Sequence, residues 1–226
     1  MATFDGKVLV LGANGETGRR VVANLHRKGI AVRAMVRSED RMRGRPELLL
    51  NGVETLIGSV LNAEDMRRAV RGVRAVISAL GARMHYSAEE IEAIEVTALI
   101  NLVAAALEQR VQQIVICSSL GTETPEQVPN LAPILRQKRR GELVVIHSGI
   151  PYTIVRPGGL TNAPASNQVL IAAKLGSFGM ISREDVAEVL VQALLQPEAR
   201  GKVVEIISQA GFGAADREKL FERAAS

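Results

Sequence analysis

The chain has 226 residues, of which 47% are hydrophobic and only 3% aromatic, and its formal net charge is +4. This length fits one domain with a sizeable core of Leu, Val, Ile and Ala side chains. So mild a basic excess with so few aromatic rings argues against nucleic-acid binding, although it suits an anionic ligand.

The single cysteine, Cys117, excludes an intramolecular disulfide and fits a reducing compartment. Cys117 ends an apolar run, so we interpret it as a small buried residue and not as a nucleophile. No apolar run approaches the ~20 residues of a membrane-spanning helix. The first residues, MATFDGKV, contain no charged-then-apolar leader. We therefore expect a cytoplasmic location, or an organelle stroma for a mature form.

The first forty residues have the pattern of a strand, a glycine turn, a helix and a second strand. Val8–Leu11 is a short run of mostly branched apolar residues, typical of a buried strand. A helical pattern follows and ends at Gly29, and Ile30–Val36 is predicted to be the next strand. This arrangement is the one that binds a dinucleotide.

Three glycines occupy the turn at three-residue spacing, each with a distinct expected role. Gly12 lets the chain turn sharply off the strand, Gly15 lacks a Cβ that would hold a pyrophosphate away, and Gly18 lets the helix pack closely. The free N–H groups and the positive end of the helix dipole favour a phosphate there. A tight turn without a ligand is the alternative.

The end of the second strand bears on the choice of cofactor. NAD-binding proteins commonly place an acidic residue there for the ribose hydroxyls, but here Arg37 follows Val36. A guanidinium can pair with the 2′-phosphate of NADP in a forked geometry, so the sequence favours NADP(H) over NAD(H). Further positive charge is expected from Arg33, Arg41, Arg43 and Arg45. The alternative is a solvated basic loop.

The alternation of strands and helices continues along the chain. Further strands are predicted over 52–58, 74–80, 113–117, 152–156 and 202–207. Helices are predicted after Pro46 and Asn62, over 87–109, over 131–148 with Gly141 inside or at a break, after Ser182, and over 216–224. The segment 161–180 has no clear pattern.

Such alternation predicts an α/β fold of the Rossmann type, a doubly wound parallel sheet in a single domain spanning 1–226. The segment 161–181 is the only stretch available as a small substrate-side extension. The ligand is expected outside the carboxyl ends of the strands. The loops that should line the site begin at Gly12, Arg37, Gly58, Ser78, Ser118 and Pro157.

Several stretches together resemble a known family. VLGANGETGRRVV, AVRAMVR, AVISALGA, SGIPYTIVRPGGLT and ISREDVAEVLVQAL occur in the order found in atypical short-chain dehydrogenase/reductases, in the NAD(P)-binding branch that is NmrA-like and biliverdin-reductase-B-like. The resemblance spans residues 7–207. It is specific for the superfamily and much less so for the substrate.

The resemblance implies a set of site residues by position. The implied cofactor-binding residues are Gly12, Ala13, Asn14, Gly15, Glu16, Thr17, Gly18, Arg37, Ser78, Ala79, Leu80, Gly81, Lys138, Pro157, Gly158, Gly159 and Leu160. The implied catalytic residues are Ser118, Ser119 and Lys138. Lys138 would bond the nicotinamide ribose or supply a proton, and its alternative is a solvated residue in a basic run. No metal site is expected.

Two departures from the family pattern matter. The position of the usual catalytic tyrosine, four residues before the lysine, holds Ile134, and the two tyrosines are Tyr86 and Tyr152. The serines can polarise a carbonyl but cannot donate a proton without a relay. His85, in a loop, is a weak candidate acid. After the third strand the family often has a Gly-Asp pair, but this chain has Gly58-Ser59. A carboxylate near the adenine of the cofactor is therefore missing.

These features predict an NADPH-dependent oxidoreductase acting on a small carbonyl, quinone or flavin-like substrate. The alternative is a non-catalytic NADP(H)-binding redox sensor or assembly factor, which would need a protein partner. A role with nucleic acid is the weakest interpretation.

We expect a monomer or a homodimer. The apolar helix 87–109 is a possible dimer seam, although burial within the monomer explains the same pattern.

Overall fold

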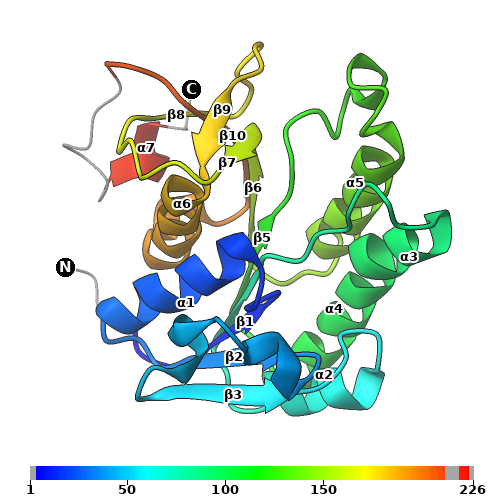
Figure 1. Cartoon of the computed structure of the whole chain (residues 1–226), viewed down its shortest axis with the longest axis vertical. Helices are drawn as coiled ribbons and strands as arrows, with labels where there is room; N and C mark the ends of the chain where they lie inside the picture. Colours follow the sequence, from blue (N-terminus) through cyan, green and yellow to red (C-terminus); the bar gives the residue numbers. More distant parts are fainter. Residues whose placement is uncertain (1–3, 212–218, 224–226) are drawn as a thin grey trace.

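The structure is a computed structural model that describes residues 4–211 and 219–223. Its centre is an eight-stranded sheet with helices on both faces (Figure 1). The strand order is β3-β2-β1-β4-β5-β6-β10-β8. The strands are β1 (Val8–Leu11), β2 (Val32–Val36), β3 (Val53–Ile57), β4 (Ala75–Ser78), β5 (Gln113–Cys117), β6 (Tyr152–Pro157), β8 (Val169–Ala172) and β10 (Lys202–Ser208). The predicted Rossmann-type fold is therefore confirmed.

The sheet is parallel from β3 through β10, but its last strand is not. β8 pairs with β10 in the antiparallel direction, so the prediction of an entirely parallel sheet was wrong at this edge. The sequence showed no clear pattern over 161–180, but this part of the chain is ordered into strands. It contains β8 and reaches into both strands of a second, two-stranded sheet, β7 (Gly159–Thr161) and β9 (Met180–Ser182).

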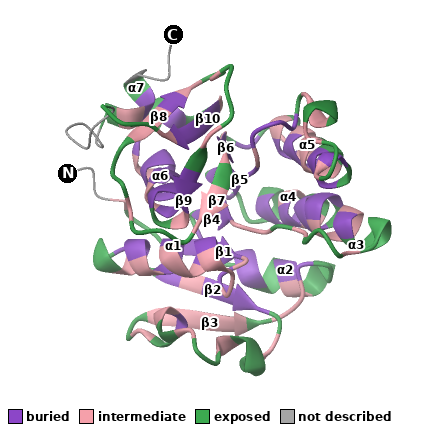
Figure 2. Cartoon of the chain, turned by 45° about the horizontal axis from the view of Figure 1, so that its top comes forward, coloured by how far each residue is buried: buried purple, intermediate pink, exposed green. Residues whose placement is uncertain are grey.

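The helices form two layers, each with its own hydrophobic core. On one face α1 (Glu16–Arg27) packs against α6 (Arg183–Leu195). On the other face lie α2 (Ala63–Val70), α4 (Ala98–Glu108) and α5 (Ala132–Ile146). The central strands β1, β4 and β5 are buried along their whole length, whereas the edge strand β3 is half-buried (Figure 2).

Local signals explain where several helices begin and end. The Asn62 side chain accepts hydrogen bonds from the N–H groups of Glu64 and Asp65 at the start of α2. Ser182 accepts from the Asp185 N–H at the start of α6. After α1, Gly29 adopts φ +71°, the left-handed conformation that ends helices. The expected caps at these three positions are confirmed.

The helix predicted over 87–109 is continuous but not uniformly α-helical. It comprises α3 (Ala88–Glu92), a π-helical turn (Ala93–Thr97) and α4. Its apolar face is largely buried in the chain's own core, so that pattern needs no dimer to explain it. Gly141 lies inside α5 without a break. Of the closing helix predicted over 216–224, the structure shows α7 (Leu220–Arg223), and the remainder falls mostly outside the described residues.

The register of the sheet positions the site. Leu11, the last residue of β1, lies opposite Ser78, the last residue of β4. The strand order reverses between these two strands, and a crevice outside the carboxyl ends at such a point is where ligands bind in this kind of sheet.

Candidate cofactor and active site

The glycine turn after β1 is built by close backbone contacts. Gly12 has φ +72°, and a Cβ there would lie 2.6 Å from the Ala79 carbonyl oxygen after β4. A Cβ on Gly18 would lie 2.1 Å from the Gly12 carbonyl oxygen, so the start of α1 sits directly on the turn. The sharp turn expected at Gly12 and the close packing expected at Gly18 are both confirmed.

The first turn of α1 is open to an anion. Its N-cap is Gly15, so no side chain caps the helix, and the first N–H groups of a helix have no partner within it. The nearest atom to a Cβ on Gly15 would be the Gly12 carbonyl oxygen at 3.1 Å. The bare face of Gly15 and the uncapped N–H groups of residues 16–18 fit a pyrophosphate. By contrast Ala13 and Thr17 are buried and contribute to packing.

Glu16 carries a negative charge at this helix start, but neighbouring arginines balance it. Arg19 and Arg20 donate hydrogen bonds to its carboxylate, and these bonds lower the pKa of Glu16 to about 2. Arg45 also pairs with Glu16, and its Nε donates to the Asn14 carbonyl at 3.0 Å. Arg45 therefore braces the glycine turn.

A cleft extends from this turn across the ends of β2, β3 and β4. The predicted residues that line it are Gly12, Asn14, Gly15, Arg37, Ala79, Leu80 and Gly81. Sequence reasoning missed Arg83 and Tyr86, which also line the cleft, because their segment has no recognisable pattern. Arg37, Arg41 and Arg83 are exposed and form no ion pair with any residue of the described ranges.

The other predicted basic residues do not face the cleft freely. Arg33 lies near the amino end of β2, where it bonds Glu54 and the Ala69 carbonyl at the end of α2. The expectation that Arg33 adds positive potential at the site was therefore wrong. Arg43 pairs with Asp40 on the surface.

A second, much narrower cavity lies beside the cleft and shares Leu80 and Ile94 with it. Ser78, Cys117, Ser118 and Lys138 line this inner cavity together with Glu95 and Glu142. Three of the predicted segments, at the ends of β4 and β5 and on α5, thus come together here. Lys138 is close to Gly81, since a Cβ on that glycine would lie 3.9 Å from Nζ.

Lys138 is largely buried and bonded. Its Nζ donates to Oε2 of Glu95 at 2.9 Å, and their side chains are only 12% and 5% exposed. Burial alone would lower the pKa of Lys138, but the charge and hydrogen bond of Glu95 outweigh burial and raise it. Lys138 is therefore a stable cation near neutral pH. That property suits a clamp for ribose hydroxyls better than a proton source.

The two predicted serines differ in their hydrogen bonds. Ser118 is buried and donates its hydroxyl to Oε1 of Glu142 at 2.6 Å. Ser119 is half-buried and donates to the carbonyl of Leu120 at 3.1 Å. Because a hydroxyl has one proton, Ser118 in this arrangement can only accept from a substrate.

The predicted nicotinamide border after β6 has a strong packing role. A Cβ on Gly158 would lie 2.2 Å from the Gly179 carbonyl oxygen, and the Gly159 N–H donates to the same oxygen at 2.9 Å. Pro157 is buried, and Leu160 packs against the core. These four residues line neither the cleft nor the inner cavity.

Other candidate acids contribute little. Tyr152 lies at the start of β6, and Ile134 is buried in α5 at the family's tyrosine position. His85 is exposed and packs edge-on against Tyr86.

Within residues 4–211 and 219–223, no cluster of three His, Cys, Asp or Glu side chains could hold a metal. In the same ranges no helix is long and apolar enough to cross a membrane.

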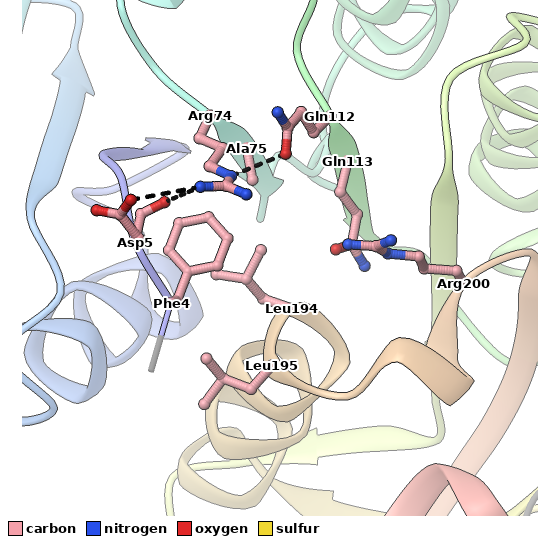
Figure 3. Close-up of a pocket in the computed structure, with 9 residues that line it drawn as sticks. All are labelled: Phe4, Asp5, Arg74, Ala75, Gln112, Gln113, Leu194, Leu195 and Arg200. Atoms are coloured by element: carbon pink, nitrogen blue, oxygen red, sulfur yellow. Dashed lines mark hydrogen bonds and ion pairs between the residues drawn. The ribbon is translucent and has the colours of Figure 1, made fainter. Parts of the chain in front are cut away.

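A separate pocket lies at the opposite ends of the strands (Figure 3). It is formed by Phe4, Leu194 and Leu195 with the polar side chains of Arg74, Gln112 and Arg200. Arg74 bonds Gln112 and the Asp5 carbonyl there. None of the predicted site residues lines this pocket, so the candidate site is the cleft and the inner cavity.

Comparison with known proteins identifies the family of the chain. A family model described as NAD(P)H-binding matches residues 12–197. An uncharacterized chloroplastic protein of Arabidopsis thaliana is 36% identical over 232 residues, covering 95% of this chain and 81% of the relative. Sanguinarine reductase of Eschscholzia californica is 29% identical, covering 93% and 92%.

A solved Bacillus halodurans structure, provisionally named an NAD-dependent epimerase/dehydratase, superimposes with a TM-score of 0.86 at 30% identity. The superposition covers 96% of this chain and 99% of that one. The chain is thus an α/β protein with an NAD(P)H-binding domain. It belongs to the NAD(P)H-binding family, among the atypical short-chain dehydrogenase/reductases that the sequence resembles.

Proposed function

We propose that the protein is an NADPH-dependent reductase of a small planar acceptor such as a quinone, a flavin or a conjugated carbonyl compound. The observation that carries the cofactor choice is the pair Arg37 and Arg41. Both line the cleft beyond the end of β2, and neither has an ionic partner in the described part of the chain. Unpaired guanidinium groups at this position suit the 2′-phosphate of NADP, and no carboxylate follows β2 directly to hold the ribose of NAD.

The assigned roles follow from position. Residues 16–18 would receive the pyrophosphate on their N–H groups, and Lys138 would donate hydrogen bonds to the nicotinamide ribose. The cofactor, when bound, supplies a hydride. Ser118 and Ser119, directly after β5, would lie beside the substrate. We keep Pro157–Leu160 in the proposal as the border of the nicotinamide.

The acceptor class is proposed from the three positions where the family resemblance would place the proton donor. Ser118 donates its proton to Glu142, the pKa of Lys138 is raised, and an isoleucine replaces the family's tyrosine. Reduction of an isolated ketone needs an acid at the developing alkoxide. A quinone or flavin instead delocalises the added charge and can take its proton from water.

Two exposed apolar side chains of the segment 161–181 support a planar acceptor. Phe178 and Met180 are both 56% exposed. The Phe178 ring approaches Gly121, since a Cβ on that glycine would lie 3.6 Å from Cε1. These side chains, from the proposed substrate-side segment 161–181, offer an aromatic ring and a polarisable thioether for stacking. One relative, sanguinarine reductase, is also named as a reductase, which supports a reductase activity for this chain.

The test is NADPH oxidation with a panel of quinones, flavins and aldehydes, together with binding of NADPH and NADH to the parent and to Arg37→Ala. We expect turnover with quinones or flavins, tighter binding of NADPH, and loss of most of that preference in the variant. Equal affinity for the two nucleotides in the parent would contradict the cofactor assignment. Tight NADPH binding with no turnover would favour a redox sensor or assembly factor.

A further inference from the structure

The π-helical turn at Ala93–Thr97 places an unexpected carboxylate in the candidate site. A π turn interrupts an α-helix rarely and often at functional positions. At the centre of this turn Glu95 is 4% exposed and faces the inner cavity. Glu92, three residues earlier on the same helix, pairs with Arg140 at the surface. Only Glu95 is directed inward.

The Glu95 carboxylate joins two parts of the site. Its Oε2 accepts a hydrogen bond from Nζ of Lys138 on α5 at 2.9 Å, and its Oε1 accepts from the Ala82 N–H at 2.7 Å. Ala82 follows Gly81, which lines the cofactor cleft. One carboxylate therefore holds both the loop after β4 and the lysine.

The backbone around this contact is tightly packed. A Cβ on Gly141 would lie 2.0 Å from the Glu95 carbonyl oxygen, so α5 touches the π turn backbone to backbone. Gly141 is three residues after Lys138 and therefore lies on the same face of α5. The bare glycine lets α5 approach closely enough for Lys138 to reach the carboxylate.

A stabilising role does not explain this pair well. Burying two opposite charges costs desolvation that their attraction barely repays, so such a pair is weak support for stability. The pair does, however, keep Lys138 charged. The charges of Glu95, Cys117 and Glu142 all raise the pKa of Lys138, and Glu95 raises it most.

We infer that Glu95 is a positioning residue for the cofactor: it keeps Lys138 directed at the nicotinamide ribose and fixes the Gly81–Ala82 backbone along the same nucleotide. This inference rests on the proposed function. It adds a residue outside the motifs of the sequence, and it assigns a purpose to the π turn. Removing the Glu95 charge should weaken nucleotide binding through Lys138 and make that binding sensitive to alkaline pH.

The test compares NADPH dissociation constants, by titration calorimetry between about pH 7 and pH 10, for the parent, Glu95→Gln, Lys138→Met and the double variant. Glutamine keeps an oxygen for the Ala82 N–H and loses the charge. We expect Glu95→Gln to weaken binding by roughly tenfold to a hundredfold, the range for a hydrogen bond to a charged group. We also expect its binding to weaken further towards pH 10, and the double variant to be no worse than Lys138→Met.

Glu92→Gln is the matched control, because Glu92 lies on the same helix and pairs with an arginine at the surface; we expect parent affinity. Parent affinity in Glu95→Gln at every pH, or an effect that adds in full to that of Lys138→Met, would overturn the inference. If Glu95→Gln does not fold, the neutral pair Glu95→Gln with Lys138→Gln replaces it and should bind like Lys138→Gln alone. The proposed function fails separately, when the parent itself does not bind NADPH.

Discussion

Arg156 and Glu142 form a two-point ion pair that is almost completely buried. Nε of Arg156 donates to Oε1 at 3.0 Å and Nη2 donates to Oε2 at 2.7 Å, with side chains only 2% and 0% exposed. The same carboxylate accepts from Ser118, Thr122 and Arg139. The pair therefore connects β6, α5 and the loop after β5, where the predicted serines lie.

Removing one partner of this pair should lower the free energy of unfolding strongly, and replacing both partners should lower it less. A single Glu142→Leu or Arg156→Leu change removes the main partner of a buried charge. The remaining charge keeps only a partly exposed partner, Glu123 for Arg156 or Arg139 for Glu142, so we expect a loss of up to ~3–5 kcal/mol in the free energy of unfolding. The double variant should lose clearly less than the sum of the two. Urea unfolding measures all three. Arg140→Ala, at the exposed Glu92–Arg140 pair, should lose less than ~1 kcal/mol. Additive losses at Glu142 and Arg156 would contradict this prediction.

The free energy of unfolding should also fall at acid pH, because Glu142 then becomes protonated. Burial alone would raise the pKa of Glu142, but the hydrogen bonds and charge of Arg156, with Ser118 and Arg139, hold it below its ordinary value. A carboxyl with a lowered folded pKa stabilises fully above the unfolded pKa of ~4.3, and this contribution is lost as the pH falls through the folded pKa.

The measurement is the free energy of unfolding of the parent and of Glu142→Gln between about pH 7 and pH 3. Below about pH 4.3 the parent should lose stability more steeply than the variant. Glu16 and Glu54, whose pKa values are also lowered, titrate in both proteins and cancel in the difference. Parallel curves below that pH would show that Glu142 does not contribute.

Much of the fold follows from local sequence signals. Short apolar runs bounded by glycines predict the strands from β1 to β6 to within about two residues, because burial and turn chemistry act locally there. The pairing of β7, β8 and β9 could not be predicted in this way. Gly159 bonds the Gly179 carbonyl twenty residues later, and long-range contacts among small side chains leave no periodic pattern.

The site was predictable where backbone geometry decides it. The rule that ligands lie at the carboxyl ends of strands brings the Gly12 and Ala79 loops together, as the structure does. Arg33 could have been excluded by the same rule, since it stands near the amino end of β2. Glu95 could not be foreseen, because a π turn changes which side of a helix a residue faces and no sequence pattern marks it.

Cys117 should be inert in the folded protein. Burial, followed by the nearby Glu95 charge, raises the pKa of its thiol to about 11, although Lys138 and Arg183 oppose the shift. At pH 8 only roughly one thiol in a thousand is then a reactive thiolate. We expect iodoacetamide to modify Cys117 in urea and not in buffer, as followed by intact mass. Rapid modification of the native protein would mean that the inner cavity opens to solvent.

Alanine substitutions at two glycines of the turn should separate an effect on folding from an effect on nucleotide binding. At Gly18 an alanine Cβ would meet the Gly12 carbonyl oxygen at 2.1 Å, so Gly18→Ala should cost ~1–3 kcal/mol of stability by overpacking and also disrupt the phosphate site. At Gly15, φ is −74° and the nearest approach is 3.1 Å, so Gly15→Ala should fold with a loss below ~1 kcal/mol.

The Gly15→Ala Cβ would nevertheless project over the uncapped start of α1, where the pyrophosphate is proposed to lie. We expect NADPH binding to weaken by roughly tenfold or more, equivalent to at least ~1.4 kcal/mol, although thermal unfolding of the free protein stays near that of the parent. Calorimetric titration and a melting curve on the same sample test both halves. A Gly15→Ala protein that binds NADPH as the parent does would place the pyrophosphate elsewhere, because no ligand could then lie against this face of the turn.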